Sequence, residues 1–346
     1  MELCNRIDKK ILKEWIKADP TPRTTISFYR YVNIADPKTL RDELYLAWNE
    51  LGVLGRIYIA KEGINAQFSV PSDHLESFRK HLDSYDEFRD MPLKIAVEDD
   101  GKSFYKLVIK VKKKIVADGL NDDAFDTTNV GRHLTAKEWN EYLEKEDTVV
   151  VDMRNHYESE VGHFKKAILP DVDTFREELE YVKKELKDRK DKKVLLYCTG
   201  GVRCEKASAY LKSEGFQDVN QLYGGIIDYA RQIKANGLEN KFRGKNFVFD
   251  ERVGERITDD IISECHQCGA PCDRHVNCKN DACHLLFIQC EECGERFEGT
   301  CTPRCQEITK LPLDQQKEIR RGAAKTDCLQ VYKSRLRPNL KEILQS

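Results

Sequence analysis

A cysteine between a short apolar run and a helix-like segment constrains this chain more than any other feature. Residues 194–197 predict a buried strand, and the small and apolar residues after position 204 predict a helix. Between them lies the loop Cys198-Thr199-Gly200-Gly201-Val202-Arg203. Backbone N–H groups and the dipole of a helix N-terminus favour negative charge. The loop therefore predicts a strand–loop–helix unit that holds Cys198 as a thiolate, with Arg203 adding positive charge.

Length and charge narrow the class of protein. A chain of 346 residues suggests two or three domains. Its charged fraction is 34% and its formal net charge is −2, and no apolar run reaches the length of a membrane span. The first 17 residues are charged and lack the apolar core of a signal peptide. We therefore expect a cytoplasmic protein with no membrane partner, whose cysteines are metal ligands or reactive thiols.

The coarse pattern of strands and helices divides the chain into three blocks. Residues 1–118 follow the order βαββαβ, which predicts a ferredoxin-like, acylphosphatase-like α+β domain; the strands are expected at 24–32, 56–60, 65–70, 93–97 and 104–116. Residues 119–131 are polar and predict a linker. Residues 132–240 alternate strands and helices, which predicts an α/β domain with a parallel sheet. Residues 241–346 begin with a predicted hairpin, continue into a cysteine-rich region and end in a basic tail.

The second block resembles a rhodanese domain. The resemblance rests on Asp152-Met153-Arg154-Asn155, Tyr157-Glu158, Gly162-His163-Phe164, the Cys198 loop and Gly224-Gly225-Ile226. It implies that Cys198 is a nucleophile that accepts sulfur and holds it as a persulfide. The backbone of Thr199, Gly200, Gly201 and Val202 would then cradle the anionic sulfur. Asp152, Arg154, Glu158 and His163 are interpreted as structural.

Two details of the loop refine its chemistry. Four residues separate Cys198 from Arg203, whereas cysteine phosphatases have five, and position 204 is a second cysteine instead of a phosphate-clamping arginine. Both details disfavour a phosphatase. Cys204 has two interpretations: it could resolve a persulfide or sulfenic acid as a disulfide, or it could simply fill the first helical turn.

Motifs outside the rhodanese block resemble the bacterial tRNA uridine hydroxylase family. They are Arg23–Tyr29 (RTTISFY), Ala60–Ala66 (AKEGINA), Asp100–Phe104 (DGKSF), Cys198–Lys206 and Gly244–Arg252 (GKNFVFDER). The match covers nearly the whole chain and weakens after about residue 306. It implies O2-dependent hydroxylation of uridine C5 at tRNA wobble position 34, giving 5-hydroxyuridine, with the rhodanese-loop cysteine required. The residues themselves identify no redox cofactor, because neither a glycine-rich dinucleotide fingerprint nor a certain two-histidine, one-carboxylate triad is present.

Nine of the 13 cysteines lie between positions 265 and 305. Because a Cys-x2-Cys turn supplies two ligands to a tetrahedral ion, Cys265 and Cys268 with Cys290 and Cys293 predict one structural zinc site. A second site would draw on Cys272, Cys278, Cys283, Cys301 and Cys305, with His266, His275 or His284 as further candidates. An iron–sulfur cluster and metal-free redox thiols remain alternatives.

Basic residues near aromatic residues suggest contacts with RNA. The candidates are Lys112, Lys113, Lys114, Arg243 and Lys245, together with a tail over 306–346 whose net charge is +4 from nine basic and five acidic residues. We expect the anticodon arm of tRNA to span the first and third blocks. Two other functions stay open: a sulfurtransferase that carries a cysteine persulfide to an acceptor, and a zinc-stabilised RNA-binding module in which the rhodanese fold is only a scaffold.

Overall fold

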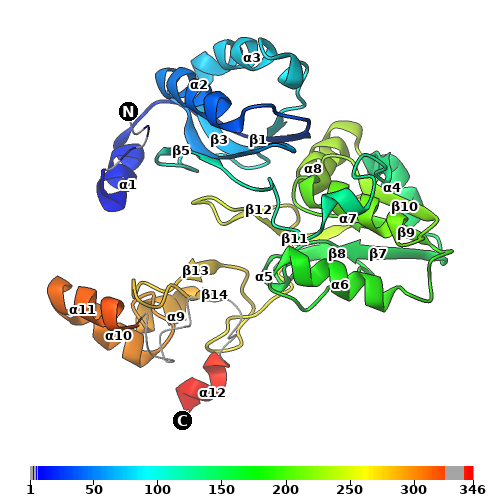
Figure 1. Ribbon diagram of the computed structural model, residues 1–346. Helices are drawn as coiled ribbons and strands as arrows, with labels where there is room; N and C mark the ends of the chain where they lie inside the picture. The colour runs from blue at the N-terminus through cyan, green and yellow to red at the C-terminus, as the bar shows by residue number, and fades with distance from the viewer. Residues whose placement is uncertain (1–2, 4, 6, 324–338, 346) are drawn as a thin grey trace.

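The computed structural model describes residues 3, 5, 7–323 and 339–345 (Figure 1). Residues 324–338, a large part of the predicted basic tail, lie outside the described residues. Helix α1 (Lys9–Ala18) precedes the first sheet. Among the described residues, no helix has both the length and the apolar character needed to cross a membrane.

The first domain is built on a five-stranded sheet in the order β4-β1-β3-β2-β5. Its strands are β1 (Arg23–Tyr31), β2 (Leu54–Ala60), β3 (Gly63–Pro71), β4 (Lys94–Ile95) and β5 (Leu107–Val111). The first four strands pair antiparallel, and β5 adds to β2 in parallel. The ferredoxin-like prediction is therefore confirmed. The strands predicted at 93–97 and 104–116 are shorter than expected, because the chain leaves the sheet beyond Val111, where Lys114 reaches Asp118 and Asp122.

Apolar and polar side chains alternate along the strands of the first sheet, so its two faces differ in polarity. Ile26, Phe28 and Phe68 pack against helices α2 (Pro37–Glu50) and α3 (Leu75–Asp83), which cover one face. Pro37 occupies the first turn of α2, and the side chain of Asp36 accepts hydrogen bonds from two backbone N–H groups there. Ser27 and Tyr29 alternate with these core residues along β1, so their side chains lie on the opposite face. That face is turned toward the second domain (Figure 1).

The second domain is a parallel four-stranded sheet in the order β6-β10-β9-β7. Its strands are β6 (Arg132–Leu134), β7 (Thr148–Asp152), β9 (Lys193–Tyr197) and β10 (Asp218–Leu222). Helices α6 (Phe175–Glu185) and α7 (Val202–Ser213) pack on one face, and α4 (Ala136–Leu143) and α8 (Gly225–Asn236) pack on the other. Residues of β9 alternate between the two cores, so both faces of this sheet are buried, as predicted for an α/β domain.

A small three-stranded sheet, β12-β11-β8, connects the second domain to the cysteine-rich region. It contains β8 (Gly162–Phe164), which follows α5 (His156–Ser159), and the predicted hairpin, β11 (Phe242–Phe247) and β12 (Gly254–Arg256). The remaining elements are β13 (His275–Asn277), β14 (Leu286–Ile288), α9 (Glu291–Arg296), α10 (Pro303–Lys310), α11 (Leu313–Ala323) and α12 (Leu340–Gln345).

The segment predicted as a linker, 119–131, takes part in the contact between the first two domains. Asp122 binds both Lys114 of the first domain and Lys206 of α7, at 2.9 Å each. Lys206 also reaches Glu62 at 2.7 Å, and its side chain is almost completely buried. These buried ion pairs fix how the open face of the first sheet lies against the start of α7.

Candidate active site

Cys198 lies at the end of β9, in a loop whose backbone is arranged to face its sulfur. Gly201 has a φ of +100°, a conformation that side chains other than glycine rarely adopt, and its N–H donates to Cys198 Sγ at 3.1 Å. The carbonyl oxygens of Cys198 and Thr199 accept hydrogen bonds from N–H groups of Ile226 and Ile227 at the start of α8. Because these carbonyls are held away from the sulfur, the loop presents donors to it.

The groups around the Cys198 sulfur keep it ionised at neutral pH. Burial opposes its ionisation, but a hydrogen bond from the Cys204 thiol, the charge of Arg203 and backbone N–H groups outweigh that effect and lower the pKa of Cys198 to about 5. Burial and the neighbouring Cys198 raise the pKa of Cys204 well above its usual value. Cys198 is therefore the ionised sulfur of the pair, and Cys204 is its protonated donor.

Gly225 allows the loop to lie against α8. A Cβ atom at this position would be 2.6 Å from the carbonyl oxygens of Cys198 and Thr199, so only glycine fits there. Its φ is +68°, which also favours glycine. Gly224 also has a positive φ, of +66°, and the two glycines form a tight turn beside the loop.

Arg203 points back toward the loop and binds a buried carboxylate. Its two terminal nitrogens donate to Glu158 at 2.7 and 2.8 Å, and Thr199 Oγ1 lies 3.5 Å from the guanidinium. Glu158 is completely buried and also accepts from the backbone N–H of Asn155 at the start of α5. This bidentate pair fixes the position of the positive charge behind Cys198. The sequence does not reveal this pair, because 45 residues separate Glu158 from Arg203 along the chain.

The other rhodanese-motif residues serve the loops around the site. Asp152 and Arg154 form a buried bidentate ion pair at 2.6 and 2.8 Å, and Arg154 also donates to the carbonyl of Gly162. His163 Nδ1 lies 2.9 Å from the carbonyl oxygen of Ser159. These contacts are those of positioning residues.

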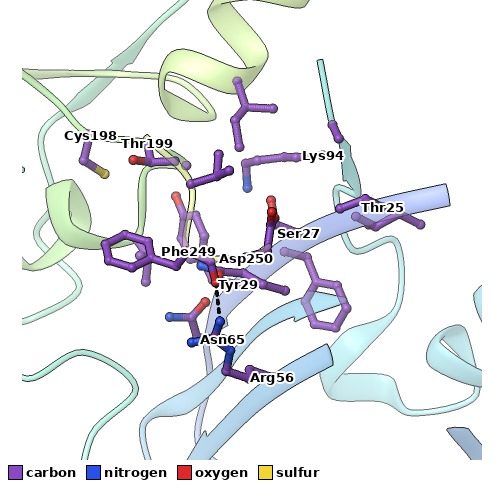
Figure 2. Close-up of a pocket in the computed structure, with 18 of the residues that line it drawn as sticks. Thr25, Ser27, Tyr29, Arg56, Asn65, Lys94, Cys198, Thr199, Phe249 and Asp250 are labelled. Carbon is purple, nitrogen blue, oxygen red and sulfur yellow. Dashed lines mark hydrogen bonds between the residues drawn. The ribbon is translucent and has the colours of Figure 1, made fainter. Parts of the chain in front are cut away.

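Cys198 opens onto a cavity of about 270 Å³ that lies between the first domain, the second domain and the segment after β11 (Figure 2). Cys198 and Thr199 line one side, and side chains of the first sheet line the other. Phe249 and Asp250 come from the third block. Arg56 of β2 links the first domain to this segment, because it donates a hydrogen bond to the carbonyl oxygen of Phe249 at 2.6 Å.

Several cavity residues were not predicted as site residues. The first domain contributes Tyr29, whose hydroxyl donates to Glu205 of α7 at 3.0 Å, and Lys94, whose Nζ lies 4.4 Å from the centre of the Tyr29 ring. The only signal in the sequence was the family motif around Tyr29. Lys94 belongs to no quoted motif, and its approach to Cys198 depends on how two domains pack.

The cysteine-rich region contains two sets of four thiols. One set is Cys265, Cys268, Cys290 and Cys293, and the other is Cys278, Cys283, Cys301 and Cys305; within each set all four sulfurs lie within 4.8 Å of one another. Three Sγ–Sγ distances within these sets are 3.6 to 3.7 Å: Cys268 to Cys290, Cys283 to Cys301, and Cys301 to Cys305. A tetrahedral zinc ion with Zn–S bonds of about 2.3 Å requires a separation of about 3.8 Å. Both sets therefore fit a single tetrahedral ion, and Cys272, His266, His275 and His284 lie outside them.

The lysines and arginines predicted to contact RNA have different surroundings. Lys112 lies over the ring of Tyr58, which lines the cavity, and Lys113 is exposed. Lys114 is bound to Asp118 and Asp122, so its charge is neutralised within the protein. Arg243 and Lys245 pair with Asp260 and Asp273.

Comparison with known proteins agrees with this architecture. Family models match residues 23–115 (UPF0176 acylphosphatase like domain), residues 135–232 (Rhodanese-like domain) and residues 243–306 (Rhodanase C-terminal). The predicted fold classes of the first two domains are confirmed by these matches.

Whole-chain relatives carry one name. A protein of Leptospira interrogans named tRNA uridine(34) hydroxylase is 59% identical over 99% of this chain and 93% of its own length. Proteins of the same name from Photorhabdus laumondii and Escherichia fergusonii are 54% and 53% identical, each over 92% of this chain, and the matches cover 91% and 92% of their own lengths. The site geometry, the domain order and these identities agree: the chain belongs to the tRNA uridine(34) hydroxylase family.

Proposed function

We propose that this protein hydroxylates C5 of uridine 34 in tRNA, giving 5-hydroxyuridine, with O2 as the co-substrate and Cys198 as the reactive side chain. The name shared by the whole-chain relatives supports the reaction. The single observation that carries the role of Cys198 is its place in the structure. An ionised, fully buried sulfur opens onto a cavity that residues of all three blocks line.

The composition of the cavity favours a ring-sized substrate over a small sulfur donor. Aromatic and aliphatic side chains form much of its lining: Tyr29, Tyr58, Phe104, Val116, Ile227, Val248 and Phe249. Such walls suit the faces of a pyrimidine base, because bases stack on aromatic side chains. The rhodanese domain alone would supply only one side of this cavity.

Within that cavity, each part of the loop has a role. Cys198 approaches the substrate as a thiolate, and the N–H groups of Gly201, Arg203 and Cys204 stabilise negative charge on its sulfur. Arg203, held by Glu158, contributes a fixed positive charge. Cys204 donates a hydrogen bond to Cys198, and the same proximity would let the two thiols form a disulfide after oxidation of the first.

We infer that the anticodon arm of tRNA lies along the outer edge of the first sheet. Lys112 and Lys113 are exposed there, next to Tyr58 of the cavity lining. The double variant Lys112→Glu/Lys113→Glu should weaken tRNA binding and reduce the dependence of log Kd on log salt by about 1.4, because each lost phosphate contact removes about 0.7. Unchanged affinity and slope would exclude this path.

The two cysteine sets are proposed to hold structural zinc. Each set is complete with four protein ligands and leaves no open position, as in other structural sites. The ions would hold β13, β14 and α9 together. In each set, the four sulfurs lie within 4.8 Å of one another, which favours a single ion. The cysteines of an iron–sulfur cluster bind different irons and would lie further apart.

The function can be tested in cells that lack the gene. Mass spectrometry of tRNA nucleosides should show loss of 5-hydroxyuridine, restored by the wild-type gene and not by Cys198→Ser. Loss of a thiolated base would instead identify a sulfurtransferase. An unchanged set of nucleosides, with tRNA still bound by the purified protein, would identify an RNA-binding module.

A further inference from the structure

A single lysine of the first domain faces the Cys198 loop across the cavity. Lys94 belongs to β4, at the edge of the first sheet, and only 8% of it is exposed. Figure 2 shows its side chain extending from the first domain toward Cys198 and Thr199. Its closest described aromatic contact is the face of the Tyr29 ring, 4.4 Å from Nζ.

Lys94 differs from the other buried cations of the described chain because no carboxylate contacts it. Arg154, Arg203 and Lys206 each have a carboxylate oxygen within 3 Å. No carboxylate of the described residues lies within 4 Å of Lys94 Nζ, and burial lowers its pKa to about 8 despite the more distant Asp228, Cys198 and Glu205. A buried, unpaired ammonium is costly, and the ring of Tyr29 compensates for only part of that cost. Its free donors therefore suit a ligand in the cavity.

The other described cations that line the cavity also have partners within the protein. Arg56 donates to the carbonyl of Phe249, and Arg203 is held by Glu158. Arg252 is bound to Asp250 and Glu255. Among the described lining residues, Lys94 is thus the cation whose donors are not used by the protein.

The surroundings of Lys94 favour a carbonyl oxygen over a phosphate as its ligand. A phosphate presents several charged oxygens and is usually bound by more than one cation or by a bidentate guanidinium. Here one ammonium faces a cavity with largely apolar and aromatic walls. A flat ring with one exposed carbonyl oxygen matches that arrangement.

Resting on the proposed function, we propose that Lys94 selects uracil at position 34 by donating a hydrogen bond to its 4-carbonyl oxygen. An ammonium can donate but cannot accept. Uracil presents an acceptor at position 4, whereas cytosine presents an amino group that also donates. A cytosine in the same orientation would leave the buried ammonium unpaired and place two donors against each other. Lys94 is therefore the specificity-determining residue that excludes cytidine.

The test measures binding of anticodon stem–loop RNAs by fluorescence anisotropy. Three RNAs are compared, with uridine, cytidine or a pyrimidine lacking the 4-oxygen at position 34. Wild-type protein should bind the uridine RNA about tenfold more tightly than the other two, because a site built for a carbonyl rejects analogues that lack it. Lys94→Met should bind all three with nearly equal affinity, and Lys94→Arg should restore part of the preference.

One control variant tests whether the loss of preference is specific to Lys94. Lys112→Met, which removes an exposed lysine near the cavity, should weaken binding of all three RNAs by the same factor. The proposal is overturned if wild-type protein does not distinguish uridine from the 4-deoxy base. It is also overturned if Lys94→Met lowers all three affinities equally, which would assign Lys94 to a phosphate or to the thiolate. The wild-type comparison stands even if Lys94→Met does not fold.

The two proposals fail in different ways. If the cellular nucleoside experiment shows no 5-hydroxyuridine linked to this gene, the proposed function fails whatever the binding ratios are. If 5-hydroxyuridine depends on the gene and the binding preference does not depend on Lys94, only the present inference fails.

Discussion

At the scale of single residues, the state of the Cys198 sulfur decides the chemistry. The loop lowers the pKa of Cys198 to about 5 by means of the Cys204 hydrogen bond, the Arg203 charge and backbone N–H groups, against the effect of burial. Since an acid with a lowered pKa stays ionised until the pH falls below that value, the thiolate persists across the neutral range. Cys204 remains protonated under the same conditions because its pKa is raised.

This difference predicts the pH dependence of alkylation. The rate at which iodoacetamide modifies Cys198, followed by peptide mass spectrometry, should be near its plateau by about pH 6 to 7 and should fall as the pH decreases through about 5. Cys204→Ala removes a donor to the sulfur, so the midpoint should move to higher pH. A wild-type rate that keeps rising to about pH 9, as for an ordinary cysteine, would contradict the thiolate assignment.

At the scale of elements, the β9–α7 loop depends on the backbone at Gly201. Its φ of +100° is unfavourable for other residues, and a Cβ atom would lie 2.7 Å from the hydroxyl oxygen of Tyr29. Gly200, the preceding residue, serves as the control position, because a Cβ atom added there meets no atom within 4 Å. The loop therefore contains one glycine that the conformation requires and one that faces open space.

Alanine substitutions at the two glycines should accordingly differ. Gly201→Ala should destabilise the protein by about 1 to 3 kcal/mol through backbone strain and should abolish most activity, because the Tyr29 contact and the N–H donated to Cys198 both shift. Gly200→Ala should leave the melting temperature nearly unchanged. Equal melting temperatures for the two variants would show that the loop is not strained.

The cysteine-rich elements predict a metal content. Purified protein should contain about two zinc ions per chain, and Cys278→Ser should reduce this to about one while lowering the melting temperature. Cys272→Ser is the control, because Cys272 is buried in the same region but belongs to neither set. Metal analysis by mass spectrometry checks both values, and loss of zinc from Cys272→Ser would contradict the ligand assignment.

At the scale of the whole molecule, the cavity exists because two domains pack against each other. Lys206 of α7 is buried between Glu62 of the first domain and Asp122 of the connecting segment. Lys206→Met would leave both carboxylates without this partner, which should cost about 3 to 5 kcal/mol and expose segment 119–131 to proteases. Lys137→Met, at an exposed position of α4, should digest like wild type. Identical proteolysis of the two variants would show that this contact does not hold the domains together.

The sequence was sufficient for features that are local. Cys198, Arg203 and the glycines after β10 lie in short motifs, and the order of strands and helices follows from hydrophobic periodicity. The pairing of Cys265, Cys268, Cys290 and Cys293 also follows from two Cys-x2-Cys turns. The second set could not be deduced, because its ligands have irregular spacing and several residues competed for four positions.

Features that depend on packing between domains could not be predicted. Lys94 is separated from Cys198 by more than 100 residues, and β4, which positions it, has only two residues. The sequence predicts Lys112, Lys113 and Lys114 together as candidate RNA contacts, but Lys114 turns inward to Asp118 and Asp122. A charge pattern does not show which lysines are neutralised by residues on a following segment.

We propose that the Cys198 thiolate acts on uridine 34 of tRNA with O2. The most direct test of this proposal grows the gene-deletion strain, carrying wild-type, Cys198→Ala or Lys137→Met genes, under ¹⁸O2 and measures wobble nucleosides by mass spectrometry. We expect 5-hydroxyuridine carrying one ¹⁸O atom with the wild-type and Lys137→Met genes, and none with Cys198→Ala. Full levels of labelled 5-hydroxyuridine with Cys198→Ala, or unlabelled product with the wild-type gene, would contradict it.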